Sequence, residues 1–138
     1  MNKPWTAVAG TYATVLVVML VLDLLWLGVL AKPLYQAAIG HLMAPQPSWP
    51  AALLFYVVFA LGLTLFGVWP QADAPGLLRT LLMGALFGFF AYATYDLTNL
   101  ATLRNWPIGI TLIDMAWGST VSGFSAAAGK WALDRLAA

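Results

Sequence analysis

The feature that most constrains this chain is the length of its apolar stretches. Four stretches are long enough to cross a bilayer as helices: 9–31, 51–69, 76–102 and 107–131. Segments that contain proline or charged residues separate them. The hydrocarbon core of a bilayer is about 30 Å thick, a distance that about 20 apolar residues span as a helix. We therefore predict an all-α protein, an antiparallel bundle of four transmembrane helices with both termini on one side.

The composition favours the same class. Only 8% of the 138 residues are charged and 62% are hydrophobic, whereas a soluble domain carries roughly 25% charged residues. The length predicts one integral membrane domain over residues 1–138. The chain has no cysteine, no glutamate, one histidine and no basic run, so we expect no metal, no cofactor and no nucleic acid. Membrane lipid is the expected partner, and a second copy of the chain could be another.

The basic residues predict how the spans are oriented. Cytoplasmic ends of spans carry more lysine and arginine than the opposite ends. The N-terminus, second loop and C-terminus carry Lys3, Arg79, Lys130 and Arg135, against Lys32 and Arg104 in the first and third loops. Both termini are therefore expected in the cytoplasm. The first span could be mistaken for a cleaved signal peptide, but its long apolar run and Asp23 favour a retained span.

Three acidic residues lie inside the predicted spans. Asp23 lies about eight residues from the outer end of its span, Asp96 about six and Asp114 about seven. At 1.5 Å per residue, each carboxyl group lies roughly 9–12 Å below the outer boundary. A charged aspartate near the bilayer centre costs about 2.5–3.5 kcal/mol, so such residues face the bundle interior and seek partners. The sequence therefore predicts one acidic layer in the outer half of the membrane.

Aromatic and polar residues share the helical faces of these acids. Asp23 and Asp114 each begin the pattern D-x-x-W, which puts an indole one helical turn from its own acid. The third span adds phenols and an amide near Asp96. We predict that these side chains line a polar chamber open toward the periplasm. The candidate ligand or proton site comprises Asp23, Trp26, Tyr92, Tyr95, Asp96, Asn99, Asp114, Trp117 and Ser122.

Little in the sequence compensates the charge of this layer. Arg104 could be an anchor at the membrane interface or a charge partner of Asp96. Three acids in a low-dielectric layer cannot all be charged cheaply, so at least one is expected to carry a proton at neutral pH. The second span carries no charge and is expected to serve as scaffold, or to face lipid or a second copy of the chain. Gly84 and Gly88, four residues apart on the third span, predict a close contact between helices.

The motifs around the acids resemble a known family. DLLWLG, followed by Tyr35 and Gly40, then YATYDLTNLATLRNWP and IDMAWG, resemble an uncharacterised bacterial membrane family, domain of unknown function 2177. The resemblance covers nearly the whole chain. It implies a small multi-span protein of the bacterial inner membrane, and it implies no reaction. The motif residues correspond here to Asp23, Trp26, Tyr95, Asp96, Asn99, Asp114, Trp117 and Gly118.

Three classes of function remain open. The first is a pocket that binds, or acts on, a small amphipathic or lipidic molecule, since acids and aromatic rings together can protonate a ligand or hold a cation. The second is proton- or cation-coupled transport, although the inner halves of the spans show no polar path to the cytoplasm. The third is a structural or accessory membrane subunit, in which hydrogen bonds from the acids only join the helices. We favour the first class, and whether the protein is an enzyme stays open.

Overall fold

The computed structural model describes residues 3–138, and every regular element in this range is a helix. The long helices are α1 (Trp5–Leu25), α3 (Trp49–Gly62), α4 (Leu78–Thr102) and α5 (Ile108–Leu136). Two of them continue into π-helical segments: α1 into η1 (Trp26–Leu30), and α3 into η3 (Leu63–Val68). The short elements are α2 (Lys32–Ile39) and two 3-10 turns, η2 (Gly40–Leu42) and η4 (Trp69–Gln71). The all-α prediction is confirmed for the described residues.

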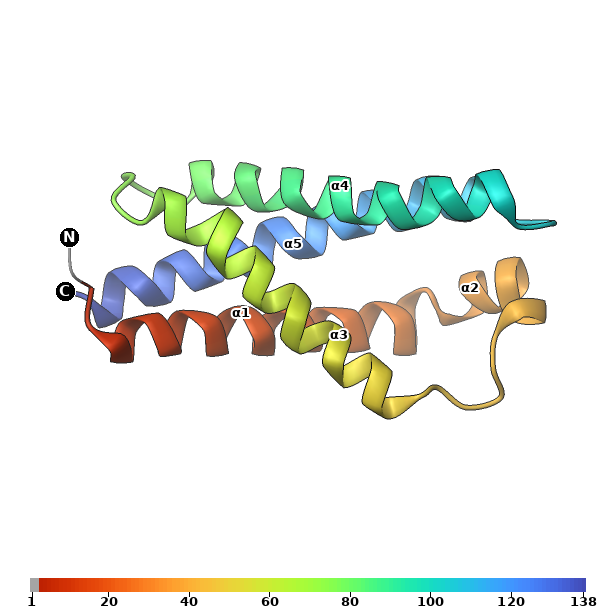
Figure 1. The fold of residues 1–138 in the computed structure, drawn as a ribbon, viewed down its shortest axis with the longest axis horizontal. Helices are drawn as coiled ribbons and strands as arrows, with labels where there is room; N and C mark the ends of the chain where they lie inside the picture. The colour runs from red at the N-terminus through yellow and green to blue at the C-terminus, as the bar shows by residue number, and fades with distance from the viewer. Residues whose placement is uncertain (1–2) are drawn as a thin grey trace.

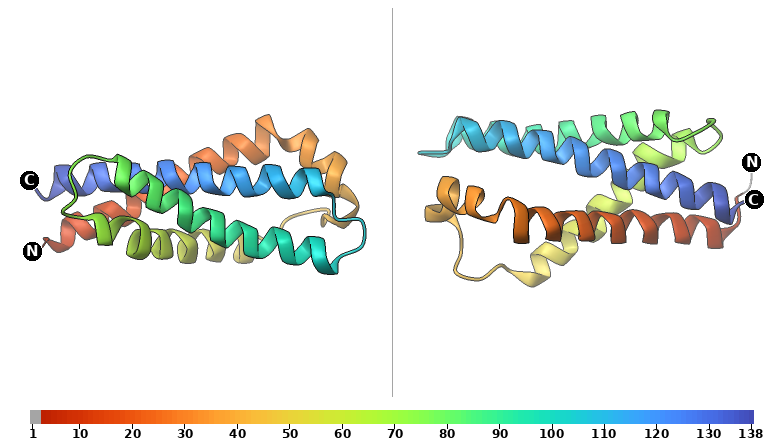
Figure 2. Two further views of the ribbon diagram at one scale, coloured as in Figure 1. Left: turned by 90° about the horizontal axis from the view of Figure 1, so that it is seen from above. Right: turned by 180° about the vertical axis from the view of Figure 1, so that it is seen from behind.

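The long helices pack along a common direction, with one exception. α1, α4 and α5 run along the length of the molecule, whereas α3 crosses α1 at an oblique angle (Figure 1). α4 and α5 lie side by side over most of their length, as the two further views also show (Figure 2). The ends of the described chain lie together at one end of the molecule, and α2 lies at the opposite end (Figure 1).

Among residues 3–138, three helices are long and apolar enough to cross a membrane: Trp5–Leu30, Trp49–Gln71 and Leu78–Thr102. They agree with the first three predicted spans to within a few residues. The first helix begins at Trp5, before the predicted start at residue 9, and the extended residue Pro4 directly precedes it. α5, which contains the predicted fourth span, is not among the three. Its buried face is rich in small residues such as Gly118, Ser122 and Ala126, which pack closely but add little hydropathy.

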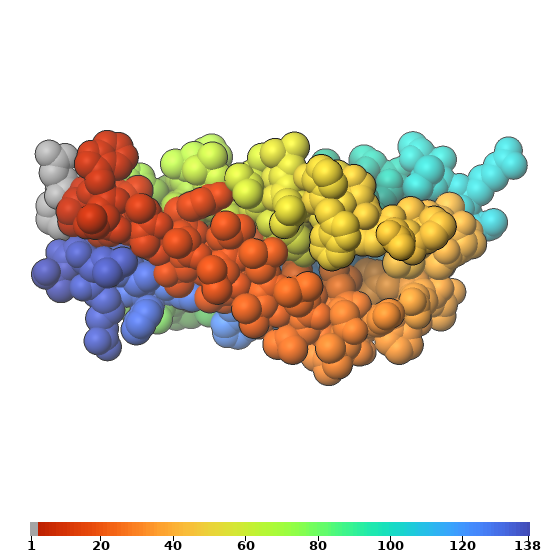
Figure 3. Space-filling view, turned by 90° about the horizontal axis from the view of Figure 1, so that it is seen from below, coloured from red at the N-terminus to blue at the C-terminus, as the bar shows by residue number. Residues whose placement is uncertain are grey.

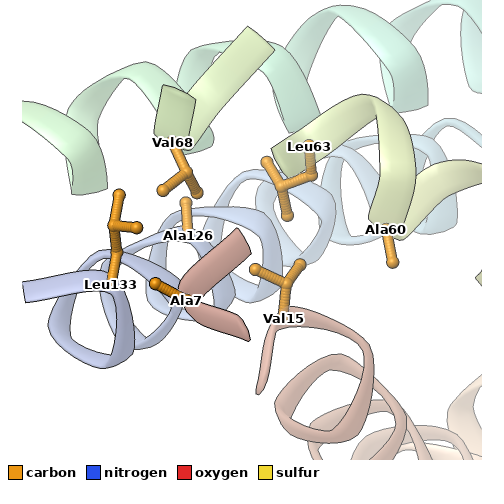
Figure 4. Packing of buried hydrophobic residues seen from close by; sticks show 7 residues of the cluster. All are labelled: Ala7, Val15, Ala60, Leu63, Val68, Ala126 and Leu133. Atoms are coloured by element: carbon orange, nitrogen blue, oxygen red, sulfur yellow. The ribbon is translucent and has the colours of Figure 1, made fainter. Parts of the chain in front are cut away.

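An apolar cluster holds the helices together in the half of the molecule that contains the chain ends. Its buried residues come from α1, α3, η3 and α5 (Figure 4): Ala7, Val15, Ala60, Leu63, Val68, Ala126 and Leu133. Ion pairs lie on the same half. Lys3 pairs with Asp73 at 3.5 Å, and Lys130, which is only 2% exposed, pairs with Asp134 at 2.5 Å.

The predicted glycine contact joins α4 to α5. A β-carbon at Gly88 would overlap the carbonyl oxygen of Gly118 and the side chain of Ser122. A β-carbon at Gly84 would lie 2.8 Å from the carbonyl oxygen of Ser122 and would overlap Ala126. The close approach predicted from the glycine spacing is therefore confirmed, and it depends on backbone groups that cannot move aside.

The outward surfaces of the helices are strongly apolar. Large hydrophobic side chains are more than half exposed on α3, η3, α4 and α5, among them Leu54, Phe66, Phe90 and Phe124. Soluble monomers rarely expose contiguous apolar surface on this scale, whereas lipid tails would cover it.

Candidate functional site

The two D-x-x-W motifs are joined to each other by hydrogen bonds. Trp117 on α5 donates from Nε1 to Oδ1 of Asp23 on α1, at 2.8 Å. Trp26 donates from Nε1 to the hydroxyl of Tyr35 at 3.2 Å, and that hydroxyl donates to Oδ1 of Asp114 at 2.5 Å. Each indole is therefore hydrogen-bonded to the acid of the other motif: Trp117 directly to Asp23, and Trp26 through Tyr35 to Asp114. The sequence spacing placed each indole near its own acid and did not predict this exchange.

The two indoles also stack on each other. The ring centroids of Trp26 and Trp117 lie 4.6 Å apart, and the ring planes differ by 8°. A parallel stack at this distance leaves no room for a ligand between the rings. Neither tryptophan lines the neighbouring cavity. The two residues thus join η1 and α1 to α5 beside the acids.

A π-helical turn brings Tyr35 to Asp114. The backbone N–H of Ala31 donates to the carbonyl oxygen of Trp26, five residues earlier, at 2.7 Å, so η1 is wider than an α-helical turn. α2 begins directly afterwards and has a proline in its first turn. Tyr35 then packs with Ala31, Trp106 and Ile110 in a small buried cluster. Single π-helical turns often occur at functional sites, because they redirect the chain.

Tyr35 remains a hydrogen-bond donor at neutral pH. Burial raises the pKa of its phenol well above the ordinary value, and the hydrogen bond to Asp114 raises it further. A neutral phenol can donate to the carboxyl group while accepting from the indole of Trp26, which is the arrangement observed.

A cavity of about 480 Å³ lies beside this network. Residues of α1, α2 and α3, which meet on the face drawn in Figure 3, line it together with residues of α4 and α5. Its polar lining residues are two acids and four phenols: Asp23, Asp114, Tyr35, Tyr56, Tyr92 and Tyr95. Its apolar lining residues are Leu27, Ile39, Ala52, Phe55, Phe59 and Ala91. The cavity therefore offers contacts to both a polar group and a hydrocarbon group.

Asp96 lies beside the cavity and has no hydrogen-bond partner. Its side chain is fully buried, and neither carboxyl oxygen accepts or donates a hydrogen bond within residues 3–138. The carboxyl group of Asp114 is close enough to interact with it, but outside hydrogen-bonding geometry. Asp23, at 3% exposure, is buried as well and also lies near Asp114. The structure thus brings the acids of three helices together.

No basic residue neutralises this cluster in the described part of the chain. The ion pairs found there are Lys3 with Asp73 and Lys130 with Asp134. Arg104 is exposed and takes part in neither pair, so the structure does not bring it to Asp96.

Other candidate residues lie at different distances from the cavity. Tyr92 packs its ring over Gly118 and lines the cavity. Tyr95 also lines the cavity, and its ring contacts that of Trp106 edge to face, with the ring centroids 5.9 Å apart. Asn99 is half-buried beside Tyr95 and does not line the cavity. Ser122 lies further along α5, in the contact with Gly88.

Two polar residues that line the cavity, Tyr35 and Tyr56, were missing from the site predicted by sequence. Tyr35 lies outside the predicted spans, where the depth argument did not reach. Tyr56 lies on the helix expected to be scaffold, yet it faces the cavity next to Asp23. A signal was present: Ala52, Phe55, Tyr56 and Phe59 follow the i, i+3, i+4, i+7 spacing of a single helical face, and all four line the cavity.

Comparison with known proteins identifies a family and no activity. A family model described as "Predicted membrane protein (DUF2177)" matches residues 8–131. No curated protein and no solved structure matches the chain. Since the match covers nearly all of the sequence, including every residue of the acid and aromatic cluster, the chain belongs to the DUF2177 family of predicted membrane proteins.

Proposed function

We propose that the protein is an antiparallel bundle of four membrane-spanning helices with both termini in the cytoplasm of a bacterial cell. α5 has 29 residues and is about 43 Å long at 1.5 Å per residue, longer than the roughly 30 Å hydrocarbon core. Its modest hydropathy reflects the small residues of its buried face, and its outward surface carries exposed apolar side chains such as Phe124 and Trp131. The pair of Lys3 and Asp73 supports placing the N-terminus and the second loop at one membrane surface.

Single-cysteine labelling tests this topology cleanly, because the natural sequence contains no cysteine. Gln46 in the first loop and Ala138 at the C-terminus are both exposed. A cysteine at Ala138 should resist a membrane-impermeant maleimide in intact cells, and one at Gln46 should react. Reaction at both positions, or at Ala138 alone, would contradict the topology.

We further propose that the cavity binds a small amphipathic molecule from the outer half of the membrane. The observation that carries this proposal is the mixed lining of the cavity, in which acids and phenols occur together with aliphatic and phenyl groups. The volume of about 480 Å³ falls within the range of about 300–1,000 Å³ typical of small-molecule sites. A purely structural polar layer would need hydrogen bonds between helices, but no cavity of this size.

Filling the cavity tests the binding proposal. Ala52 lines the cavity, whereas Ala51 precedes it on α3 and is exposed. Native mass spectrometry of the protein extracted in mild detergent should show a co-purifying organic molecule. Ala52→Trp should remove that molecule, and Ala51→Trp, the matched control, should retain it. Equal occupancy in both variants, or a wild-type protein that carries no added mass, would refute the proposal.

One observation favours coupled transport as a second candidate. Asp96 is fully buried without a partner, and isolated acids in membrane proteins often bind and release protons. In proteoliposomes containing a pH-sensitive dye, this function predicts proton movement that depends on a cationic substrate and that Asp96→Asn abolishes. Absence of such movement with every cation tested leaves binding as the function.

A further inference from the structure

The surroundings of the cavity restrict the charge of its occupant. Two acids line the cavity and a third, Asp96, lies beside Asp114. No lysine, arginine or histidine is among the lining residues, and neither ion pair of the described chain includes these acids. An anionic headgroup would therefore meet carboxyl groups in a low-dielectric site with no countercharge.

We propose that the occupant is an amphipathic organic cation: an ammonium group attached to a single apolar tail. This inference rests on the proposed binding function and adds the charge of the ligand. Within the described chain, the Tyr35 hydroxyl is the one side-chain donor to Asp114, and it donates to Oδ1; Oδ2 can therefore receive the ammonium group. The positive charge would supply the compensation that Asp23, Asp96 and Asp114 do not receive from the protein.

The aromatic lining points to the same class of ligand. Six aromatic rings line the cavity: Tyr35, Tyr56, Tyr92, Tyr95, Phe55 and Phe59. The faces of such rings attract cations, and cages of aromatic residues recognise quaternary ammonium groups. A neutral amphiphile would use the apolar lining residues equally well, but it would gain nothing from the acids. The combination of rings and uncompensated acids thus distinguishes the cation from a neutral lipid.

Three probes with the same tail test the charge preference. The full-length protein in nanodiscs of neutral lipid is titrated calorimetrically with decyltrimethylammonium, decanol and decyl sulfate, and the heat of partition into empty nanodiscs is subtracted. We expect the ammonium compound to bind at least tenfold more tightly than decanol, and decyl sulfate to show no saturable binding.

Asparagine variants locate the source of this preference. Asp114→Asn should lower the ratio of ammonium to decanol affinity several-fold. Asp23→Asn carries the same expectation and serves if Asp114→Asn fails to fold. The matched control is Asp73→Asn, which alters an acid that is 65% exposed and paired with Lys3 far from the cavity; it should keep the wild-type ratio.

The outcomes separate the two proposals. Equal affinities for the ammonium compound and decanol, tightest binding of decyl sulfate, or a ratio unchanged by removing either cavity acid would overturn the charge preference and leave the binding function standing. Failure of all three probes to bind would overturn both.

Discussion

Replacing Trp117 with phenylalanine should destabilise the protein, because it removes the hydrogen bond that joins α5 to α1. The indole Nε1 lies 2.8 Å from Oδ1 of Asp23, a side chain that is 3% exposed. Hydrogen bonds between helices in membranes average about 0.6 kcal/mol and reach about 1.7 kcal/mol. Bonds to charged groups contribute about 1.5–3 kcal/mol. The smaller ring also loses part of the stack on Trp26, where aromatic pairs contribute about 0.5–1.5 kcal/mol. We expect a loss of about 2 kcal/mol in the free energy of unfolding.

Steric trapping in bicelles measures this loss without relying on tryptophan fluorescence. Trp5→Phe is the control, since Trp5 is 87% exposed and should change stability by less than about 0.5 kcal/mol. A double-mutant cycle of Trp117→Phe with Asp23→Leu isolates the pair, with a coupling of about 1 kcal/mol expected. If Trp117→Phe costs no more than the control, or if the coupling is zero, then the hydrogen bond does not hold α1 to α5.

Three further substitutions probe separate parts of the structure. Gly88→Ala should destabilise the protein by about 1–3 kcal/mol, because the added methyl group overlaps the carbonyl oxygen of Gly118. Gly109→Ala is the control in the same steric-trapping assay: no atom lies within 4 Å of the added methyl group, so this change should be neutral or stabilising. Arg104→Gln should change stability by less than about 0.5 kcal/mol, since Arg104 is exposed and unpaired in the described chain; a larger loss would reveal a missed partner. Tyr35→Phe should release α2 by removing the hydroxyl between Trp26 and Asp114, and hydrogen exchange should rise in α2 but not in α4; unchanged exchange in α2 would show that the hydroxyl does not tether it.

The helical class and the position of the acids were predictable, because both depend on local properties of the sequence. Apolar runs identify candidate membrane helices by their length, and residue spacing puts Asp23, Asp96 and Asp114 at similar distances from the ends of their helices. The contact at Gly88 was predictable for the same reason, since a missing side chain permits close packing wherever the partner helix lies.

The hydrogen-bonding partners could not be predicted, because they depend on how the helices are rotated and crossed. Spacing alone assigned Trp26 to Asp23, yet the structure directs it through Tyr35 to Asp114. Residue spacing groups Tyr56 with Phe55 and Phe59 on one helical face, but the residues that this face meets depend on the oblique crossing of α3 over α1 (Figure 1), which spacing does not predict. α5 is not among the helices that hydropathy identifies as candidate spans, because its buried face consists largely of small residues that add little hydropathy.

An experimental structure of the protein in lipid nanodiscs, prepared without added amphiphile, tests the central claim most directly. The account predicts non-protein density in the cavity between Asp23, Tyr56 and Asp114, elongated toward Phe55 and larger than a chain of waters. The reverse result, a cavity closed by side chains or occupied by water alone while the stacked indoles of Trp26 and Trp117 stay in place, would make the acids and aromatic rings structural and contradict the binding function.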